Sequence, residues 1–160
     1  MRIRRSLRML RAGAIALMLT VSPAGAEEKA ADNMQIAREA MQAEKKLFVA
    51  ANMQMSEAEA QAFWPIYDRY QQALQQLNER YGKLIEEYAK QHDSLSDETA
   101  SKLLDEAVAL ETDRQKARQQ YLTEFRKALP IKKVARYFQI ENKIQAIVNY
   151  DLAAEIPLVE

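Results

Sequence analysis

The chain has no cysteine, a single histidine and few residues that turn a backbone. Without cysteine, disulfides cannot hold the fold, and thiolate–metal sites and a cysteine nucleophile are excluded. The histidine, His92, stands next to Asp93 in a predicted turn, where we expect a solvated loop residue rather than a base or a metal ligand. Gly82 is the only glycine after residue 26, which excludes phosphate-binding loops and the Gly-x-Ser-x-Gly elbow.

Carboxylates are plentiful, but they have the spacing of solvated helix surfaces. No pair stands in an apolar stretch that would push two pKa values apart, as acid–base catalysis requires. The sequence also has no His-x-x-x-His pair and no acidic calcium loop. We therefore expect that the protein is not an enzyme, and we predict no catalytic residue, no cofactor and no metal site.

Residues 1–26 have the three-part pattern of a secretory signal peptide. A positive front end precedes an apolar run at residues 12–21 that is too short to span a bilayer, and Ala24-Gly25-Ala26 is a cleavage pattern. We predict export by either the Sec or the twin-arginine route, cleavage after Ala26 and a periplasmic location. We predict no stable membrane span in the mature chain. The front end consists of Arg2, Arg4, Arg5, Arg8 and Arg11. The mature chain has 23 acidic and 18 basic residues, a net charge of −5.

The mature composition favours helix almost everywhere, because strong helix formers dominate and glycine and proline are rare. We predict an all-α domain at residues 34–153, between a flexible segment at 27–33 and an extended tail at 154–160. Two long antiparallel helices form its centre. The predicted helices span about residues 34–52, 97–128 and 131–153, with a second helix that starts at Ser56 and ends before a turn at residues 91–96.

Three sequence signals set these helix boundaries. Ser56 followed by Glu59 is a capping box, in which each side chain pairs with an orphan backbone N–H. Ser94 or Ser96 is expected to cap the next helix, and Pro130 suits the first turn of the last one. Pro65 lies inside the second helix, where we expect a kink near Trp64 rather than a break.

A heptad seam runs through the second helix, with apolar residues spaced alternately by four and three. Its members are Phe63, Tyr67, Tyr70, Leu74, Leu77, Tyr81, Leu84 and Tyr88. The apolar stripe of the third helix is interrupted between Glu111 and Arg118. An interrupted stripe packs poorly as a closed core and indicates a wide, wet or partner-facing surface. We therefore predict that a homodimer completes the core.

Basic residues concentrate around the junction of the last two helices. Between residues 112 and 136, eight basic residues stand against Asp113 and Glu124, a local charge of +6. This strip is either a solvated dipolar surface or a surface that attracts acidic or unfolded polypeptide; nucleic acid is not an expected partner outside the cytoplasm. The candidate client-binding residues are Arg114, Arg118, Arg126, Lys132, Lys133 and Arg136.

Trp64 and Ile66 are further client-binding candidates, because they stand off the heptad seam. They either meet another helix or are exposed. The seam aromatics beside them are expected to pack in the core.

Two five-residue segments at predicted helix starts resemble one known motif. They are Met55-Ser56-Glu57-Ala58-Glu59 and Leu129-Pro130-Ile131-Lys132-Lys133. With the signal peptide and the four helices, they resemble the Spy/CpxP family of small periplasmic proteins, whose Leu-Thr-x-x-Gln motif opens a helix, usually twice. The resemblance implies a cradle-shaped antiparallel dimer whose concave face holds unfolded clients without ATP. It also implies helix-opening roles for Met55, Ser56, Glu59, Leu129 and Pro130.

Three functions are compatible with these patterns. The first is an ATP-independent periplasmic chaperone, or holdase, that binds unfolded or misfolded envelope proteins. The second is an envelope-stress accessory or regulatory protein that binds one specific partner. The third is a metal-responsive periplasmic protein, against which the lack of histidine-rich segments argues.

Overall fold

The computed structural model describes residues 41–159. From Glu44 onward the chain forms one compact unit, and of the other unit, residues 1–43, only the helical residues 41–43 are described. The predicted signal peptide, the segment 27–33 and the predicted start of the first helix therefore lie outside the described residues. No helix within residues 41–159 is long and apolar enough to cross a membrane.

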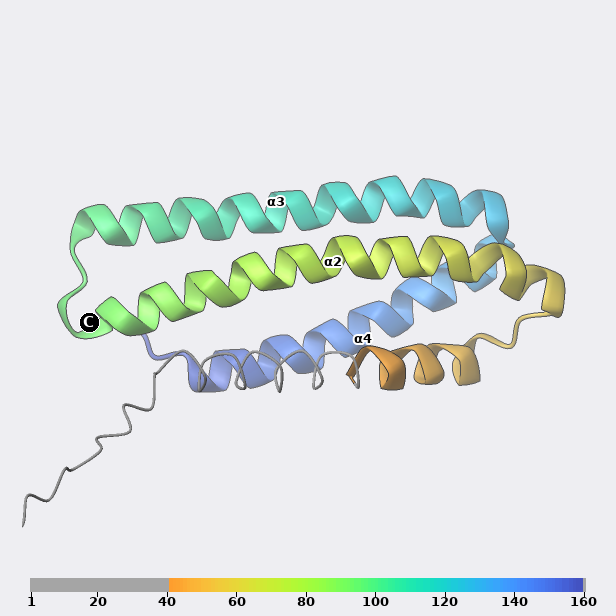
Figure 1. Ribbon diagram of the computed structural model, residues 1–160, viewed down its shortest axis with the longest axis horizontal. Helices are drawn as coiled ribbons and strands as arrows, with labels where there is room; N and C mark the ends of the chain where they lie inside the picture. Colours follow the sequence, from red (N-terminus) through yellow and green to blue (C-terminus); the bar gives the residue numbers. More distant parts are fainter. Residues whose placement is uncertain (1–40, 160) are drawn as a thin grey trace, which may run out of the picture. The chain divides into compact units, whose positions relative to one another are not determined.

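The described chain is all-α, as predicted, and contains no strand between residues 41 and 159. A first helix occupies residues 41–53. Three longer helices and one short 3-10 helix follow along the chain (Figure 1). Their bounds are α2 (Glu57–Gln91), η1 (His92–Ser94), α3 (Asp97–Ala128) and α4 (Ile131–Glu155).

The helix boundaries follow from their caps. Ser56 accepts a hydrogen bond from the N–H of Glu59, and the Glu59 carboxylate accepts one from the N–H of Ser56, which confirms the capping box. Ser96, not Ser94, caps α3 by accepting from the N–H of Thr99. Pro130 is the N-cap residue of α4, and this helix ends at Glu155, two residues beyond the predicted end. The α2 helix continues through Pro65 without a break.

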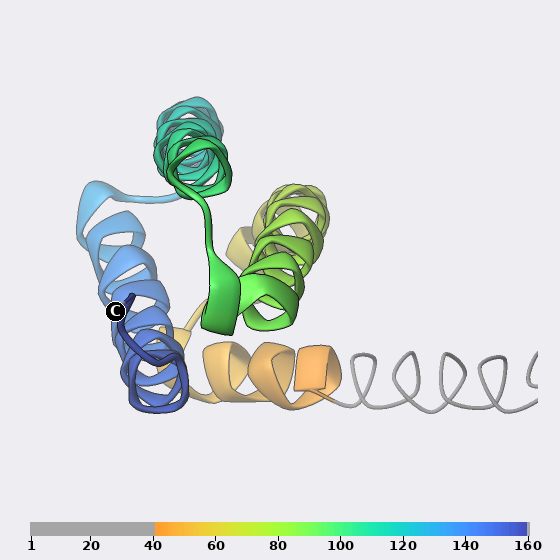
Figure 2. The same cartoon turned by 90° about the vertical axis from the view of Figure 1, so that its left-hand side faces the viewer.

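The α2 and α3 helices pack against each other as an antiparallel hairpin, and α4 crosses beneath them (Figures 1 and 2). The heptad seam of α2 is buried only along its first half. Its buried members are Phe63, Tyr67, Tyr70, Leu74 and Leu77, whereas Tyr81, Leu84 and Tyr88 are half-buried. The core therefore closes at one end of the hairpin and opens toward the other end, where α2 ends and α3 begins.

The closed end is held by a cluster of aromatic rings from three helices. The Phe125 ring of α3 lies 4.7 Å from that of Tyr137 in α4 and 5.3 Å from that of Phe63 in α2, centroid to centroid. Phe63 also meets Tyr137 edge-on at 5.1 Å. Such large rings fill the wide space between α2 and α4 and stabilise the closed end through burial and favourable edge contacts.

The helix at residues 41–53 covers this aromatic cluster with two side chains, Val49 and Met53, both essentially inaccessible to water. Its outer side carries Leu47 and Phe48, which are largely exposed. Gln54, directly after the helix, has a positive φ of 49°, an uncommon conformation that turns the chain sharply into α2.

Candidate functional site

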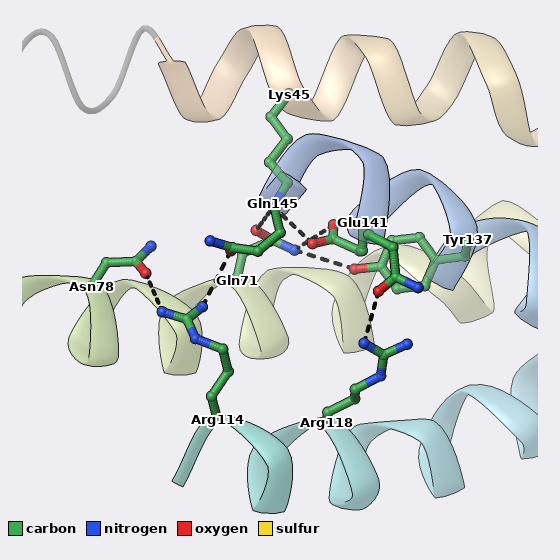
Figure 3. Close-up of polar contacts among 9 residues, drawn as sticks. Lys45, Gln71, Asn78, Arg114, Arg118, Tyr137, Glu141 and Gln145 are labelled. Atoms are coloured by element: carbon green, nitrogen blue, oxygen red, sulfur yellow. Dashed lines mark hydrogen bonds and ion pairs between the residues drawn. The ribbon is translucent and has the colours of Figure 1, made fainter. Parts of the chain in front are cut away.

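A polar layer lies directly beside the aromatic core, between α3, α2 and α4. Arg114 of α3 donates hydrogen bonds to Asn78 of α2 at 2.8 Å and to Gln145 of α4 at 3.3 Å (Figure 3). Arg118 donates to Asn142 of α4 at 2.8 Å and stacks over the Phe138 ring at 5.1 Å. The polar interruption predicted in α3 is therefore a set of cross-links between helices, since both arginines reach inward.

A buried carboxylate anchors the other side of this layer. Glu141 of α4 is only 8 % exposed and accepts a hydrogen bond from Lys45 at 2.9 Å and from Gln71 at 3.1 Å (Figure 3). Gln71 accepts from Lys45 at 2.8 Å and donates to the Tyr137 hydroxyl at 3.2 Å. Burial, followed by the nearby charge of Glu141, raises the pKa of Tyr137 far above its usual value, so this hydroxyl stays neutral. The network joins three helices through groups that are all paired.

The two motif-like segments contact each other at the closed end. Lys133, the fifth residue of the second segment, forms an ion pair with Glu59, the fifth residue of the first. Lys133 also donates to the Gln54 carbonyl at 3.0 Å. The hydrogen bond from Lys133, with that from the Ser56 N–H, lowers the pKa of Glu59. Both first residues pack in or against the core, Leu129 buried and Met55 half-buried. The sequence alone did not predict this pairing.

The predicted basic strip is divided by the structure into engaged and free charges. Four of its residues form cross-links within the unit. Arg136 donates to the Asn52 carbonyl, and the other three make the contacts described above: Arg114, Arg118 and Lys133. Lys116 pairs with Asp113 at 3.4 Å. Within residues 41–159, three exposed strip residues have no hydrogen-bond or ion-pair partner: Arg126, Lys127 and Lys132. The strip therefore consists of residues that cross-link helices and of three exposed residues that are free to meet a ligand.

Trp64 and Ile66 are half-buried and pack against the aromatic core. The Trp64 ring meets those of Phe63 and Tyr67 edge-on, at 5.0 and 5.3 Å. The ammonium group of Lys46, from the helix at residues 41–53, lies 5.2 Å from the Trp64 ring centre. Of the two alternatives predicted for Trp64, contact with another helix is the one that the structure contains.

An uncovered apolar row lies at the open end of the hairpin. Leu104 and Val108 of α3 are 65 % and 56 % exposed, and Val148 of α4 is 40 % exposed. Leu152, one turn beyond Val148, is half-buried. We call these four residues the distal surface. Figure 2 looks onto this end and shows that the α3 and α4 ribbons lie apart there.

The distal surface was not among the residues selected from the sequence. Leu104 and Val108 belong to the apolar stripe of α3. The available signal is that this stripe continues on both sides of the polar interruption. This signal predicts the apolar row on α3, but it does not predict that α4 diverges from that row.

Within residues 41–159, no group of three or more His, Asp or Glu side chains is arranged to hold a metal ion. His92 lies in η1, where its Nδ1 is 3.1 Å from the Tyr88 hydroxyl. That hydroxyl donates to the Pro157 carbonyl at 2.9 Å and so fastens the C-terminal tail to the end of α2.

No protein-family model matches the chain, and no curated protein or solved structure is significantly similar to it. The polar layer, the free basic residues and the distal surface are the features of the described residues that bear on function.

Proposed function

We propose that the protein is an ATP-independent periplasmic holdase that binds unfolded or misfolded envelope proteins. One observation carries the proposal, namely the exposure of large apolar side chains on helices that are firmly held elsewhere. Amphipathic helices normally bury such rows, and exposed apolar patches mark interaction sites. The distal surface is such a row, and a preformed apolar surface binds unfolded segments without an energy source.

The rigidity of the frame supports this proposal. The contacts of Arg114, Arg118 and Glu141 fix α3 and α4 to α2 immediately before the point where they separate. Paired polar groups thus hold the helices together up to the point where they separate, and the separation beyond it is present without a client. A surface that exists before binding avoids the cost of ordering, which helps a weak and general binder.

The free basic residues supply the second part of the proposed mechanism. Arg126, Lys127 and Lys132 lie in the last turn of α3 and the first turn of α4, where they create a local positive field. Exposed charges steer an oppositely charged chain over a distance of about 8–10 Å at ordinary ionic strength. They are expected to raise the association rate, while apolar contacts set the residence time.

We also propose that the mature protein begins after Ala26, resides in the periplasm and forms a homodimer. The signal-peptide pattern supports the first two statements. The open end of the hairpin supports the third, because a second copy would bury more of the half-covered seam around Tyr81, Leu84 and Tyr88.

An aggregation assay tests the proposed function. Mature protein, without nucleotide, is added to two unrelated unfolded substrates, and light scattering is followed as they are diluted from denaturant. A holdase delays the aggregation of both substrates at near-stoichiometric ratios. Suppression of neither substrate would contradict the proposal, and binding to one specific folded partner instead would indicate an accessory or regulatory protein.

A kinetic experiment tests the role of the free basic residues. The triple variant Arg126→Glu, Lys127→Glu, Lys132→Glu should bind an acidic unfolded substrate more slowly and with weaker salt dependence in stopped-flow measurements. A control triple variant has the same change in net charge at exposed lysines elsewhere: Lys83→Glu, Lys90→Glu and Lys143→Glu. Equal effects of both variants would mean that only the net charge matters and would refute steering by these residues.

A further inference from the structure

Two cross-links define how α3 and α4 face each other before they separate. Arg118 binds Asn142, and one turn further along Arg114 binds Gln145. The helices are antiparallel, so the same register continued for two turns places Glu111 level with Val148 and Val108 level with Leu152. The inward rows of both helices therefore continue past the last contact into the part where each row is uncovered.

Heptad spacing identifies which residues occupy these rows. On α3, the row that contains Arg118 also contains Glu111, Leu104 and Asp97, each seven residues apart. On α4, one row runs from Phe138 through Gln145 to Leu152, and a second runs from Glu141 through Val148 to Glu155. Phe138 and Glu141 are buried at the start of these rows, so Leu152 and Val148 lie on the inward side of α4.

Carboxylates flank the apolar residues of the distal surface. Glu111 and Asp97 stand one heptad on either side of Leu104, and Glu155 stands one heptad beyond Val148. None of these three carboxylates forms an ion pair with any residue in the range 41–159. Their negative charges are thus available to a ligand.

The whole open end of the hairpin carries a net negative charge, as these three carboxylates do. Residues 81–111 and 143–159 together contain ten acidic and four basic residues, a net charge of −6. The rest of the unit, residues 44–80 and 112–142, has eight acidic and twelve basic residues, a net charge of +4. The uncovered apolar row therefore lies in the acidic half of the molecule, whereas the free basic residues lie in the other half.

We propose that the distal surface, with Asp97, Glu111 and Glu155, docks a cationic amphipathic polypeptide segment. This inference rests on the proposed holdase function and names the class of client segment that the site selects. Apolar side chains of the segment contact Leu104, Val108, Val148 and Leu152. Its Lys or Arg side chains pair with the flanking carboxylates at the heptad spacing.

Charge complementarity favours a cationic segment over the other possible occupants of the distal surface. An acidic segment would place like charges beside Glu111 and Glu155, and a neutral apolar segment would leave the carboxylates without compensation. The segment 112–142 of a second copy matches the charge, with eight basic and three acidic residues, but it exposes only one large apolar side chain, Ile131. It would leave most of the distal surface uncovered.

Matched peptides test the proposal directly. Three labelled peptides of about five helical turns are compared by fluorescence anisotropy with the mature protein. One has leucines at helical spacing with lysines between them, the second has glutamates in place of the lysines, and the third has serines in place of the leucines. The first peptide should bind at least about tenfold more tightly than either of the others. Equal affinity for the lysine and glutamate peptides would overturn the proposal.

Variants locate the binding site on the protein. The double variant Leu104→Ser, Val108→Ser should weaken binding of the lysine peptide about tenfold, and Glu111→Gln with Glu155→Gln should reduce the salt dependence of its affinity. The apolar control is Leu47→Ser, Phe48→Ser, which removes comparable exposed side chains from the helix at residues 41–53. The charge control is Glu44→Gln, Glu57→Gln, which alters exposed carboxylates outside the acidic half. Equal losses in test and control variants would contradict the assigned site.

Two further measurements separate the possible failures. If the mature protein delays aggregation of unrelated substrates but the distal variants bind the lysine peptide normally, this inference is wrong and the holdase proposal stands. If it delays the aggregation of neither substrate, the holdase proposal fails whatever the peptides do. Loss of self-association in sedimentation by Leu104→Ser, Val108→Ser, with no peptide binding by the unaltered protein, would assign the surface to a second copy and overturn the proposal.

Discussion

The pair of Lys45 and Glu141 allows a quantitative test of the polar layer that holds the helices. The side chain of Glu141 is 9 % exposed and that of Lys45 is 22 % exposed, with 2.9 Å between Nζ and Oε2. Lys45→Met would leave the buried carboxylate with Gln71 as its one remaining side-chain donor among the described residues. Removing one partner of a buried pair costs about 3–5 kcal/mol, and partial access of water reduces this to about 2–3 kcal/mol here.

Two companion variants make this prediction specific. The double variant Lys45→Met, Glu141→Leu removes both charges and should recover at least about 1 kcal/mol of the loss, because no buried charge is left unpaired. The matched control is Lys46→Met, which breaks an ion pair with Asp68 whose side chains are 43 % and 57 % exposed. An exposed pair contributes about 0–1 kcal/mol.

The free energy of unfolding from urea titrations, followed by helical circular dichroism, measures all four proteins. The expected order of destabilisation places Lys45→Met first and both the double variant and Lys46→Met clearly below it. If Lys45→Met costs no more than Lys46→Met, the carboxylate of Glu141 is hydrated and the polar layer does not hold the frame as described.

Three further predictions concern the helices and their core. Gly82→Ala should stabilise the protein by about 0.5–1 kcal/mol, because Gly82 lies inside α2 and a Cβ atom there meets nothing within 4 Å; thermal unfolding will show this as a higher Tm, and a lower Tm would contradict it. Leu77→Asp should cost about 2–4 kcal/mol by placing a carboxylate at a buried seam position, so unchanged stability in denaturant would refute the heptad seam. Burial raises the pKa of Tyr70 from 10.0 to about 12, so the unfolded chain loses this proton first and stability falls as the pH rises from about 10 toward 12. In an alkaline titration, the part of the tyrosinate absorbance that belongs to the buried tyrosines should appear only together with loss of helix, whereas ionisation of all tyrosines before unfolding would contradict this.

The helix boundaries and the closed half of the core could be predicted from the sequence. The capping box at Ser56, the cap at Ser96 and the proline at residue 130 are local signals, and they gave boundaries that agree with the structure within two residues. The seam from Phe63 to Leu77 was also predicted correctly, because its period is maintained and a partner helix covers it. Local chemistry determines both features.

The arrangement of α4 could not be predicted from the sequence, since its path depends on contacts between distant residues. Nothing around Glu141 in the sequence indicates that Lys45 and Gln71 will surround it. Likewise, Arg114 and Arg118 were interpreted as surface charges because their amide partners lie far along the chain. The separation of α3 from α4 beyond these contacts, and with it the distal surface, likewise depends on the path of α4.

Hydrogen–deuterium exchange of a client in its complex with the protein tests the central claim most directly. A substrate is diluted from denaturant into a stoichiometric amount of mature protein without nucleotide, and the soluble complex is labelled and analysed by mass spectrometry. A holdase predicts that the soluble client exchanges most of its amides at the rates of an unfolded chain, with protection confined to short segments. A soluble client protected throughout like its native form, or the absence of any complex, would contradict the holdase account.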